Sequence, residues 1–135
     1  MAVFLSGSPE ATMQYAQNFA SSLKGGDVIL LEGEMGAGKT VFVKGLAKGL
    51  GITDEVLSPT YAYMNEYGDG KLYHYDCYRL TSGAQAEALG LTEYFYGNGI
   101  CVLEWAKNIS EVLPPHCIKI TIEKLGKVNR VIRVE

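Results

Sequence analysis

Residues 33–40 read Gly-Glu-Met-Gly-Ala-Gly-Lys-Thr, which matches the pattern G-x-x-x-x-G-K-[ST] of a phosphate-binding loop. The segment before it, 27–32, is short and mostly apolar, and the segment after it, 41–50, repeats apolar residues at helical spacing. Such a loop lies between a strand and a helix in the α/β folds that carry it. The motif therefore predicts an α/β fold with a site for a nucleoside triphosphate.

Each part of this loop has a physical task. We expect Gly33 and Gly38 to adopt positive φ, which lets the backbone come close to phosphate oxygens. Successive N–H groups and the start of the following helix then form an anion site. Lys39 is expected to reach the β- and γ-phosphates, and the Thr40 hydroxyl to ligate Mg²⁺. The predicted nucleotide contacts in this stretch are Gly33, Glu34, Met35, Gly36, Ala37, Gly38, Lys39, Thr40 and Val41.

Length and composition limit the remaining possibilities. A chain of 135 residues predicts one domain, 1–135, and the net charge of −3 disfavours direct binding to nucleic acid. The cysteines are odd in number, widely spaced and without a Cys-x-x-Cys pair, which predicts buried thiols rather than disulfides or zinc: Cys77, Cys101 and Cys117. No signal peptide or apolar run of transmembrane length is visible, so we expect a cytoplasmic protein that does not bind membranes.

Local patterns outline the secondary structure. A strand is expected at 2–6, followed by a helix that Ser8 caps and that the glycines at 25–26 end. This helix should bury a stripe of larger side chains: Tyr15, Phe19 and Leu23. The other expected strands are 27–32, 61–67, 71–78, 100–103, 118–122 and 128–134, and the other expected helices are 39–49, 84–89 and 106–112.

Glycine-containing turns at 68–70 and at Gly126 divide four of these strands into two hairpins. Hairpins pair antiparallel, whereas the strand–loop–helix unit at 27–49 belongs to parallel sheets. The sequence therefore predicts a three-layer P-loop NTPase-like fold of the α/β class, with a mixed central sheet flanked by helices.

Two carboxylates are candidates for the metal and water chemistry that a phosphate loop requires. Glu104 follows the apolar run 100–103, so it should lie at the carboxyl edge of the sheet, where ligands of open α/β sheets bind. Asp76 ends a strand of alternating character and could orient water or hold Mg²⁺, or it could pair with Arg79 at the surface. His74, on the same strand face as Asp76, is more typical of a structural residue than of a catalyst.

Other residues carry weaker signals. Thr60 follows a proline and could sense the γ-phosphate, as residues of switch loops do. Trp105, directly after Glu104, could pack near the site or in the core. The tyrosines of 61–78 could stack bases, but their alternation favours packing in a core or interface.

Five ordered stretches resemble the bacterial TsaE family, formerly YjeE, across nearly the whole chain. They are the loop at 33–40, Ser-Pro-Thr-Tyr at 58–61, Tyr-His-Tyr-Asp-Cys-Tyr-Arg-Leu at 73–80, Glu-Ala-Leu-Gly at 87–90 and Leu-Glu-Trp-Ala at 103–106. The resemblance implies a small P-loop ATPase that uses ATP and Mg²⁺. It also implies a part in making N6-threonylcarbamoyladenosine at position 37 of ANN-decoding tRNAs, together with the TsaD–TsaB heterodimer, through which any contact with tRNA would occur.

The resemblance also implies residue roles. Lys39 would bind phosphate, Thr40 and Glu104 would hold Mg²⁺, Asp76 would be a second essential acid, and Thr60 would belong to a switch-like loop. Trp105 would stand at the margin of the site, among the nucleotide contacts. The chain departs mildly from the family pattern, and Lys107, where the family often has an acid, makes the roles assigned to that turn less secure.

Three other functions remain open at this stage. A small-molecule kinase would clamp phosphates with several arginines, whereas this chain has three, Arg79, Arg130 and Arg133, and no visible lid. A GTPase would carry an Asn-Lys-x-Asp sequence, which is absent. A nucleotide-gated adaptor with little turnover would fit the short chain equally well.

Overall fold

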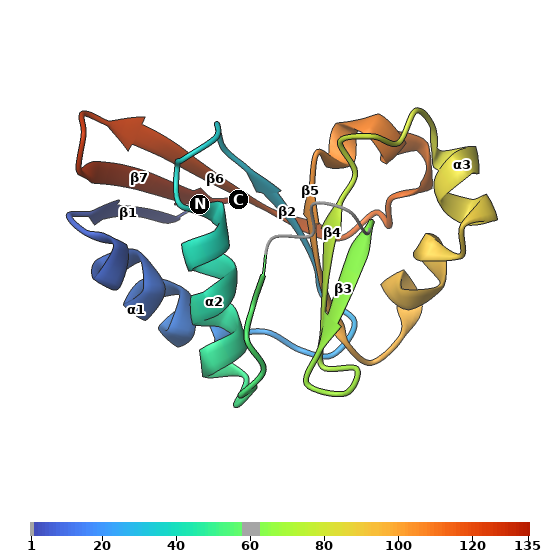
Figure 1. Ribbon diagram of the computed structural model, residues 1–135, viewed down its shortest axis with the longest axis horizontal. Helices are drawn as coiled ribbons and strands as arrows, with labels where there is room; N and C mark the ends of the chain where they lie inside the picture. Colours follow the sequence, from blue (N-terminus) through green and yellow to red (C-terminus); the bar gives the residue numbers. More distant parts are fainter. Residues whose placement is uncertain (1, 58–62) are drawn as a thin grey trace.

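The computed structural model describes residues 2–57 and 63–135, in which seven strands form one sheet in the order β1-β7-β6-β2-β5-β4-β3 (Figure 1). The strands are β1 (Ala2–Ser6), β2 (Val28–Glu32), β3 (Met64–Tyr67), β4 (Leu72–Asp76), β5 (Ile100–Glu104), β6 (Cys117–Leu125) and β7 (Asn129–Val134). The four central strands, β6, β2, β5 and β4, are parallel, whereas β1, β7 and β3 pair antiparallel. The sheet is mixed, as the sequence predicted.

Helices cover both faces of the sheet. They are α1 (Pro9–Ala20), α2 (Lys39–Gly49), α3 (Gly83–Ala88) and the 3₁₀ helices η1 (Leu91–Tyr96) and η2 (Ala106–Val112). Along β2, Ile29 packs into the apolar cluster that contains Phe42 of α2, and its neighbour Val28 packs into the cluster that contains Phe95 of η1. Alternation along the strand thus separates two cores, and the α/β three-layer architecture is confirmed. No helix in the described ranges is long and apolar enough to cross a membrane.

The first helix begins as predicted and ends earlier. The Ser8 hydroxyl accepts a hydrogen bond from the backbone N–H of Ala11 at 3.0 Å, which is the expected N-cap contact. The prediction that the glycines at 25–26 end this helix was wrong, because α1 ends at Ala20. The hydroxyl of Ser21 donates to a carbonyl of the last turn at 2.7 Å, so that end is satisfied without a glycine.

Small residues bring α1 and α2 into close contact. A Cβ built on Gly45 would lie 2.4 Å from the Met13 carbonyl and 2.7 Å from the Ala16 Cβ, so only glycine fits there. The fully buried face of α1 is accordingly formed by small side chains such as Ala16 and Ala20. The larger side chains of the predicted stripe are only half-buried at the rim of this contact: Tyr15, Phe19 and Leu23.

Apart from β6, which runs to Leu125 instead of ending at residue 122, the second half of the chain differs from the prediction in three places. The helix expected at 106–112 is a 3₁₀ helix, interrupted by the non-helical backbone of Ile109 (φ −128°). The 3₁₀ helix at 91–96 was not predicted. The strand expected at 71–78 ends at Asp76. All three differences lie in short segments, whose conformation depends more on tertiary contacts than on periodicity.

The three cysteines are free thiols, as predicted. Burial raises the pKa of Cys77 and of Cys101 to about 12, so both stay protonated at neutral pH. Cys117 is only half-buried, and its thiol donates to the Pro114 carbonyl at 3.1 Å. These thiols are part of the packing.

Candidate active site at the phosphate loop

The predicted loop joins the carboxyl end of β2 to the first residue of α2. Gly38 precedes that helix with φ +106°, and no side chain of the described residues caps the helix start by a hydrogen bond. Uncapped N–H groups at a helix start, together with the helix dipole, attract anions. Phe42, fully buried one turn later, anchors the helix against the sheet, a burial that contributes roughly 2 kcal/mol.

The loop glycines have different roles from those predicted. Gly38 has positive φ, as expected, and so does Gly36, at +80°. The prediction of positive φ for Gly33 was wrong. A Cβ on Gly33 would lie 2.7 Å from the main-chain oxygen of Ile122 on β6, so the requirement there is close approach of a neighbouring strand. Gly33 therefore fixes the loop against the sheet, and Gly36 and Gly38 allow it to turn.

Glu104 and Asp76 meet at the same edge of the sheet as the loop. Their Cα atoms are register partners at the ends of the parallel strands β5 and β4. Both line a groove of about 470 Å³ whose opposite wall is the loop and the start of α2, including Lys39 and Thr40. These two side chains therefore lie beside the loop, as the sequence predicted. The roles assigned to them stay predictions.

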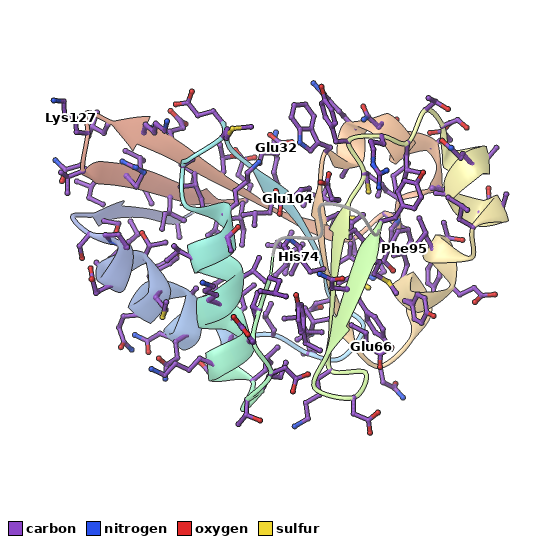
Figure 2. All side chains as sticks on the ribbon, viewed as in Figure 1. Glu32, Glu66, His74, Phe95, Glu104 and Lys127 are labelled. Carbon is purple, nitrogen blue, oxygen red and sulfur yellow. The ribbon has the colours of Figure 1, made fainter. Side chains whose placement is uncertain are left out.

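Lys39 and Glu104, which line this groove, form a chain of three polar side chains with the buried His74. Lys39 Nζ lies 3.3 Å from Glu104 Oε1, and His74 Nε2 lies 2.5 Å from Glu104 Oε2. Figure 2 labels Glu104 and His74, which lie near each other. The Lys39 and Glu104 side chains are each 14% exposed, and His74 is fully buried. Each oxygen of the carboxylate thus has its own partner.

The charge of Glu104 is set by two opposing effects. Burial raises its pKa, but the hydrogen bond from His74 and the positive charge of Lys39 outweigh burial, and the net pKa is lowered. Glu104 is therefore ionised at neutral pH, which is the form needed to ligate a cation or to accept hydrogen bonds.

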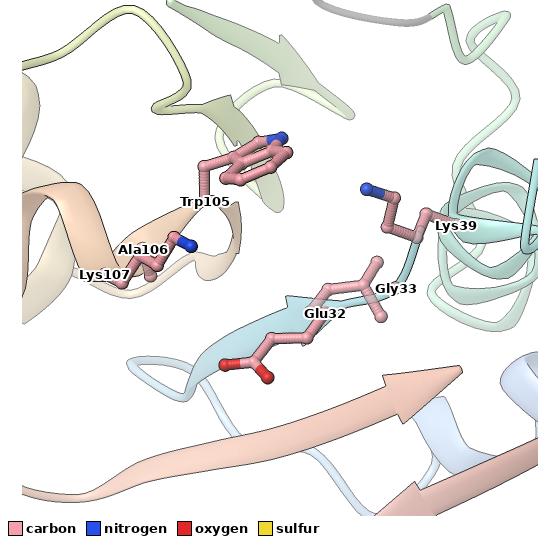
Figure 3. Close-up of a pocket in the computed structure, with 7 residues that line it drawn as sticks. Glu32, Gly33, Lys39, Trp105, Ala106 and Lys107 are labelled. Atoms are coloured by element: carbon pink, nitrogen blue, oxygen red, sulfur yellow. The ribbon is translucent and has the colours of Figure 1, made fainter. Parts of the chain in front are cut away.

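Trp105 forms the outer wall of the site. Its backbone is in the left-handed region (φ 59°), uncommon for a residue that is not glycine. The indole packs edge-on against Tyr78 at 4.8 Å, with Lys39 Nζ at 5.9 Å and Lys107 Nζ at 5.1 Å from its centroid. Figure 3 shows Lys39 and Trp105 facing each other across a cavity. The cavity has a volume of about 180 Å³, and Glu32 also lines it. Trp105 thus lies at the site, 40% exposed, rather than in the core.

The other predicted residues are placed as follows. Asp76 is half-buried, and its Oδ1 accepts a hydrogen bond from the backbone N–H of Tyr78 at 3.0 Å, which directs the chain away from β4. Thr40 is half-buried at the first turn of α2, and Val41 follows it on the same groove. Thr60 falls outside the described residues.

Arg130 on β7 is a loop contact that the sequence did not indicate. Its Nε donates to the Ala37 carbonyl at 3.1 Å, and its Nη2 lies 3.3 Å from the Gly36 carbonyl. A trans peptide points its C=O and N–H in opposite directions, so this contact turns the N–H of Gly38 away from Arg130. Only the tertiary fold brings the two segments together, and no local pattern around Arg130 signals the contact.

The aromatic residues of the β3–β4 hairpin belong to the core. Tyr75 is fully buried, and its hydroxyl donates to the Leu91 carbonyl at 2.8 Å. Tyr73 packs against Tyr94 with ring centroids 4.5 Å apart. These contacts agree with the packing interpretation and leave neither ring free to stack on a base.

Comparison with known proteins identifies the family. The sequence profile described as "Threonylcarbamoyl adenosine biosynthesis protein TsaE" matches residues 6–132. The chain belongs to the TsaE family. A relative from Bacillus subtilis, named tRNA threonylcarbamoyladenosine biosynthesis protein TsaE, is 49% identical over 125 residues, which are 91% of this chain and 78% of the relative. A protein of the same name from Treponema pallidum is 40% identical over 131 residues, 96% of this chain and 97% of that protein.

The fold comparison agrees. The crystal structure of YdiB from Bacillus subtilis superposes with a TM-score of 0.82 at 44% sequence identity, and the alignment covers 97% of this chain and 82% of that one. The resemblance to the TsaE family inferred from five short motifs is therefore confirmed over almost the whole sequence.

The side chains at this TsaE-family site match the ligands of an Mg²⁺ ion bound together with a nucleotide better than those of a metal ion held by protein side chains alone. No group of three or more His, Cys, Asp or Glu side chains in the described part of the chain has the geometry of a metal site. Mg²⁺ is commonly bound by one or two carboxylates, a hydroxyl, waters and the phosphates of a nucleotide. Thr40, Asp76 and Glu104, which line one groove beside the loop, match that donor set.

Proposed function

We propose that this chain is the Mg²⁺-dependent ATP-binding and ATP-hydrolysing component of the bacterial system that makes N6-threonylcarbamoyladenosine in tRNA. It would act in the cytoplasm with a TsaD–TsaB heterodimer, and reach tRNA only through that complex. The observation that carries the ATPase part is the 3.3 Å contact between the loop lysine, Lys39, and the strand-end acid, Glu104. The names of the relatives from Bacillus subtilis and Treponema pallidum support the pathway.

The proposed roles follow from the geometry. Lys39 and the free N–H groups of the loop and of α2 bind the β- and γ-phosphates. Thr40 and Glu104 would hold Mg²⁺, which would supply positive charge beside the phosphates. Asp76, beside Glu104 in the groove, positions the attacking water. Trp105 bounds the site on its outer side.

The arrangement of the arginines supports hydrolysis over phosphoryl transfer to a small molecule. Arg130 is engaged with loop carbonyls, and Arg133 pairs with Glu123 across the β6–β7 hairpin. Arg79 lies over the Tyr63 ring, 4.8 Å from its centroid. A kinase needs arginines turned to the transferred phosphate, and all three arginines of this chain contact other groups.

Nucleotide binding and turnover by site variants test the ATPase proposal. Lys39→Ala is expected to abolish binding or turnover, while Lys48→Ala, at an exposed position at the other end of α2, should leave both unchanged. Asp76→Ala and Glu104→Ala should lose hydrolysis more than binding, because the loop supplies most of the phosphate contacts. Wild-type turnover in Lys39→Ala would refute the site. ATP binding without measurable hydrolysis in the wild-type chain with its partners would favour the adaptor alternative.

A second experiment tests the assembly. Co-purification with TsaD–TsaB is measured with ATP, with ADP and without nucleotide, using the wild-type chain and Lys39→Ala. We expect association that depends on ATP and is weakened in the variant. Absence of association under every condition would refute the proposed partnership while leaving the ATPase result intact.

A further inference from the structure

His74, a buried polar residue beside the site, has no role in the ATPase mechanism proposed above. His74 is fully buried on the α2 face of β4, the face to which Leu72 and Val102 of the apolar cluster also belong. Its Nδ1 has no hydrogen-bond partner among the described residues. Burying an unsatisfied polar atom costs free energy that an apolar side chain of similar size would avoid. Packing alone therefore does not explain an imidazole at this position.

The contact made by the other ring nitrogen, Nε2, explains why a histidine occupies this position. His74 Nε2 lies 2.5 Å from Glu104 Oε2, and the ionised carboxylate can only accept hydrogen bonds. The proton in this contact is therefore assigned to Nε2, which donates to Glu104 Oε2.

Lys39 and His74 hold the carboxylate from opposite sides. Lys39 lies 3.3 Å from Oε1, and His74 contacts Oε2. The lysine comes from the loop and would turn to phosphate when a nucleotide binds, whereas the histidine is fully buried on β4, a strand that is paired on both sides, with β3 and β5. Among the described residues, His74 is then the side chain that still donates to Glu104.

We propose that His74 is a positioning residue that holds Oε2 of Glu104, so that Oε1 stays turned to the loop, where Mg²⁺ and phosphate bind. This inference rests on the proposed function and deepens it, because it explains how the acid keeps its place when Lys39 leaves it. A Glu side chain has three rotatable bonds, and without a fixed donor its carboxylate would leave the loop-facing position part of the time. The fraction of sites ready for Mg²⁺ would fall accordingly.

A matched pair of substitutions separates positioning from packing. In His74→Gln the side-chain amide can replace the Nε2 donor, whereas His74→Met fills a similar volume without one. Trp105, the single tryptophan, lies at the cavity wall, so its fluorescence reports binding of ADP without turnover. ADP binding is titrated against Mg²⁺ concentration and repeated in EDTA, after thermal melting has shown that each variant is folded. His74→Leu replaces the Met variant if the latter does not fold.

The Mg²⁺ concentration for half-maximal binding should rise about tenfold in His74→Met and stay within about threefold of wild type in His74→Gln, as for other groups that orient a metal ligand. Affinity for ADP in EDTA should be similar in all three proteins. In a Glu104→Ala background, His74→Met should have no further effect on the Mg²⁺ dependence.

The outcomes distinguish this inference from the proposed function. Equal Mg²⁺ requirements in the Met variant and wild type would overturn the positioning role, as would an equal defect in the Gln and Met variants. An additive effect in the Glu104→Ala background would also overturn it, because His74 would then act by another route. If wild-type ADP binding itself does not respond to Mg²⁺ or to Lys39→Ala, the proposed function fails instead.

Discussion

The contact between Arg130 and the phosphate loop leads to a quantitative prediction. The guanidinium donates to the Ala37 carbonyl at 3.1 Å and lies 3.3 Å from the Gly36 carbonyl. Arg130→Ala removes both contacts, although the loop sequence itself is unchanged. The variant therefore tests whether the fold orders the loop before a nucleotide arrives.

The magnitude follows from the hydrogen bonds lost. Each contributes about 0.5–1.5 kcal/mol net, so the pair contributes roughly 1–3 kcal/mol to the ordered loop. Part of that free energy appears as stability of the nucleotide-free protein. In the variant, nucleotide binding would have to supply part of the free energy that orders the loop. If that part is about half, binding weakens by roughly 1 kcal/mol, which is about fivefold to tenfold in Kd. Arg130→Lys keeps the positive charge but lacks the forked geometry of the guanidinium. Its Kd should lie between those of wild type and Arg130→Ala.

The assay is titration of each protein with Mg–ADP, followed by Trp105 fluorescence or calorimetry. Arg133→Ala is the matched control, because Arg133 lies on the same strand, β7, and pairs with Glu123 instead of the loop. It removes the same charge from the protein and should leave Kd within about twofold of wild type, since exposed pairs contribute little. An Arg130→Ala protein with wild-type Kd would refute the argument that this arginine orders the loop. An equal loss in both variants would assign the effect to net charge.

Three further predictions concern the core and the charges of the site. Gly45→Ala should destabilise the protein by about 1–3 kcal/mol in thermal or urea unfolding, because the new Cβ would lie 2.4 Å from a backbone oxygen of α1; Gly7→Ala, whose nearest contact is at 3.9 Å, is the control. The lowered pKa of Glu104 means that its ionised form stabilises the folded state at neutral pH. This contribution should be lost as pH falls below about 4.5 toward the folded pKa. The urea midpoints of wild type and Glu104→Gln should therefore converge in acid. Glu104→Gln should bind ADP more tightly than wild type in EDTA and gain less from Mg²⁺, and a weaker EDTA affinity would contradict a competition between Glu104 and phosphate for Lys39.

The parts of the fold that the sequence predicts are those with strong local signals. The loop at 33–40 between a strand and a helix, and the two hairpin turns, were enough to predict the α/β class and the mixed sheet. The segments 91–96 and 106–112 were missed or mistaken, because their 3₁₀ conformation depends on partners elsewhere. Asn108, for example, donates its amide to the carbonyls of Cys77 and Tyr78, thirty or more positions away in the sequence.

In the candidate site, too, some contacts could be predicted from the sequence and others could not. The convergence of Lys39 and Glu104 follows from one general rule, that parallel strands end at a common edge, and so it was predictable. The contact between Arg130 and the loop spans 93 positions of the chain and depends on β7 pairing with β6, the strand next to β2. The importance of Gly33 was predicted for the wrong reason, since its constraint is the nearby Ile122 carbonyl rather than its own φ.

Charge balance connects nucleotide binding to the metal. Before a nucleotide binds, Lys39 and Glu104 neutralise each other, and at 14% exposure neither charge is well solvated. Binding of phosphate to Lys39 would remove that partner and add further negative charge beside Glu104, in a region where water compensates poorly. A divalent cation held by Glu104 and Thr40 would restore the balance, so the proposed dependence of nucleotide binding on Mg²⁺ would follow from the contact between Lys39 and Glu104.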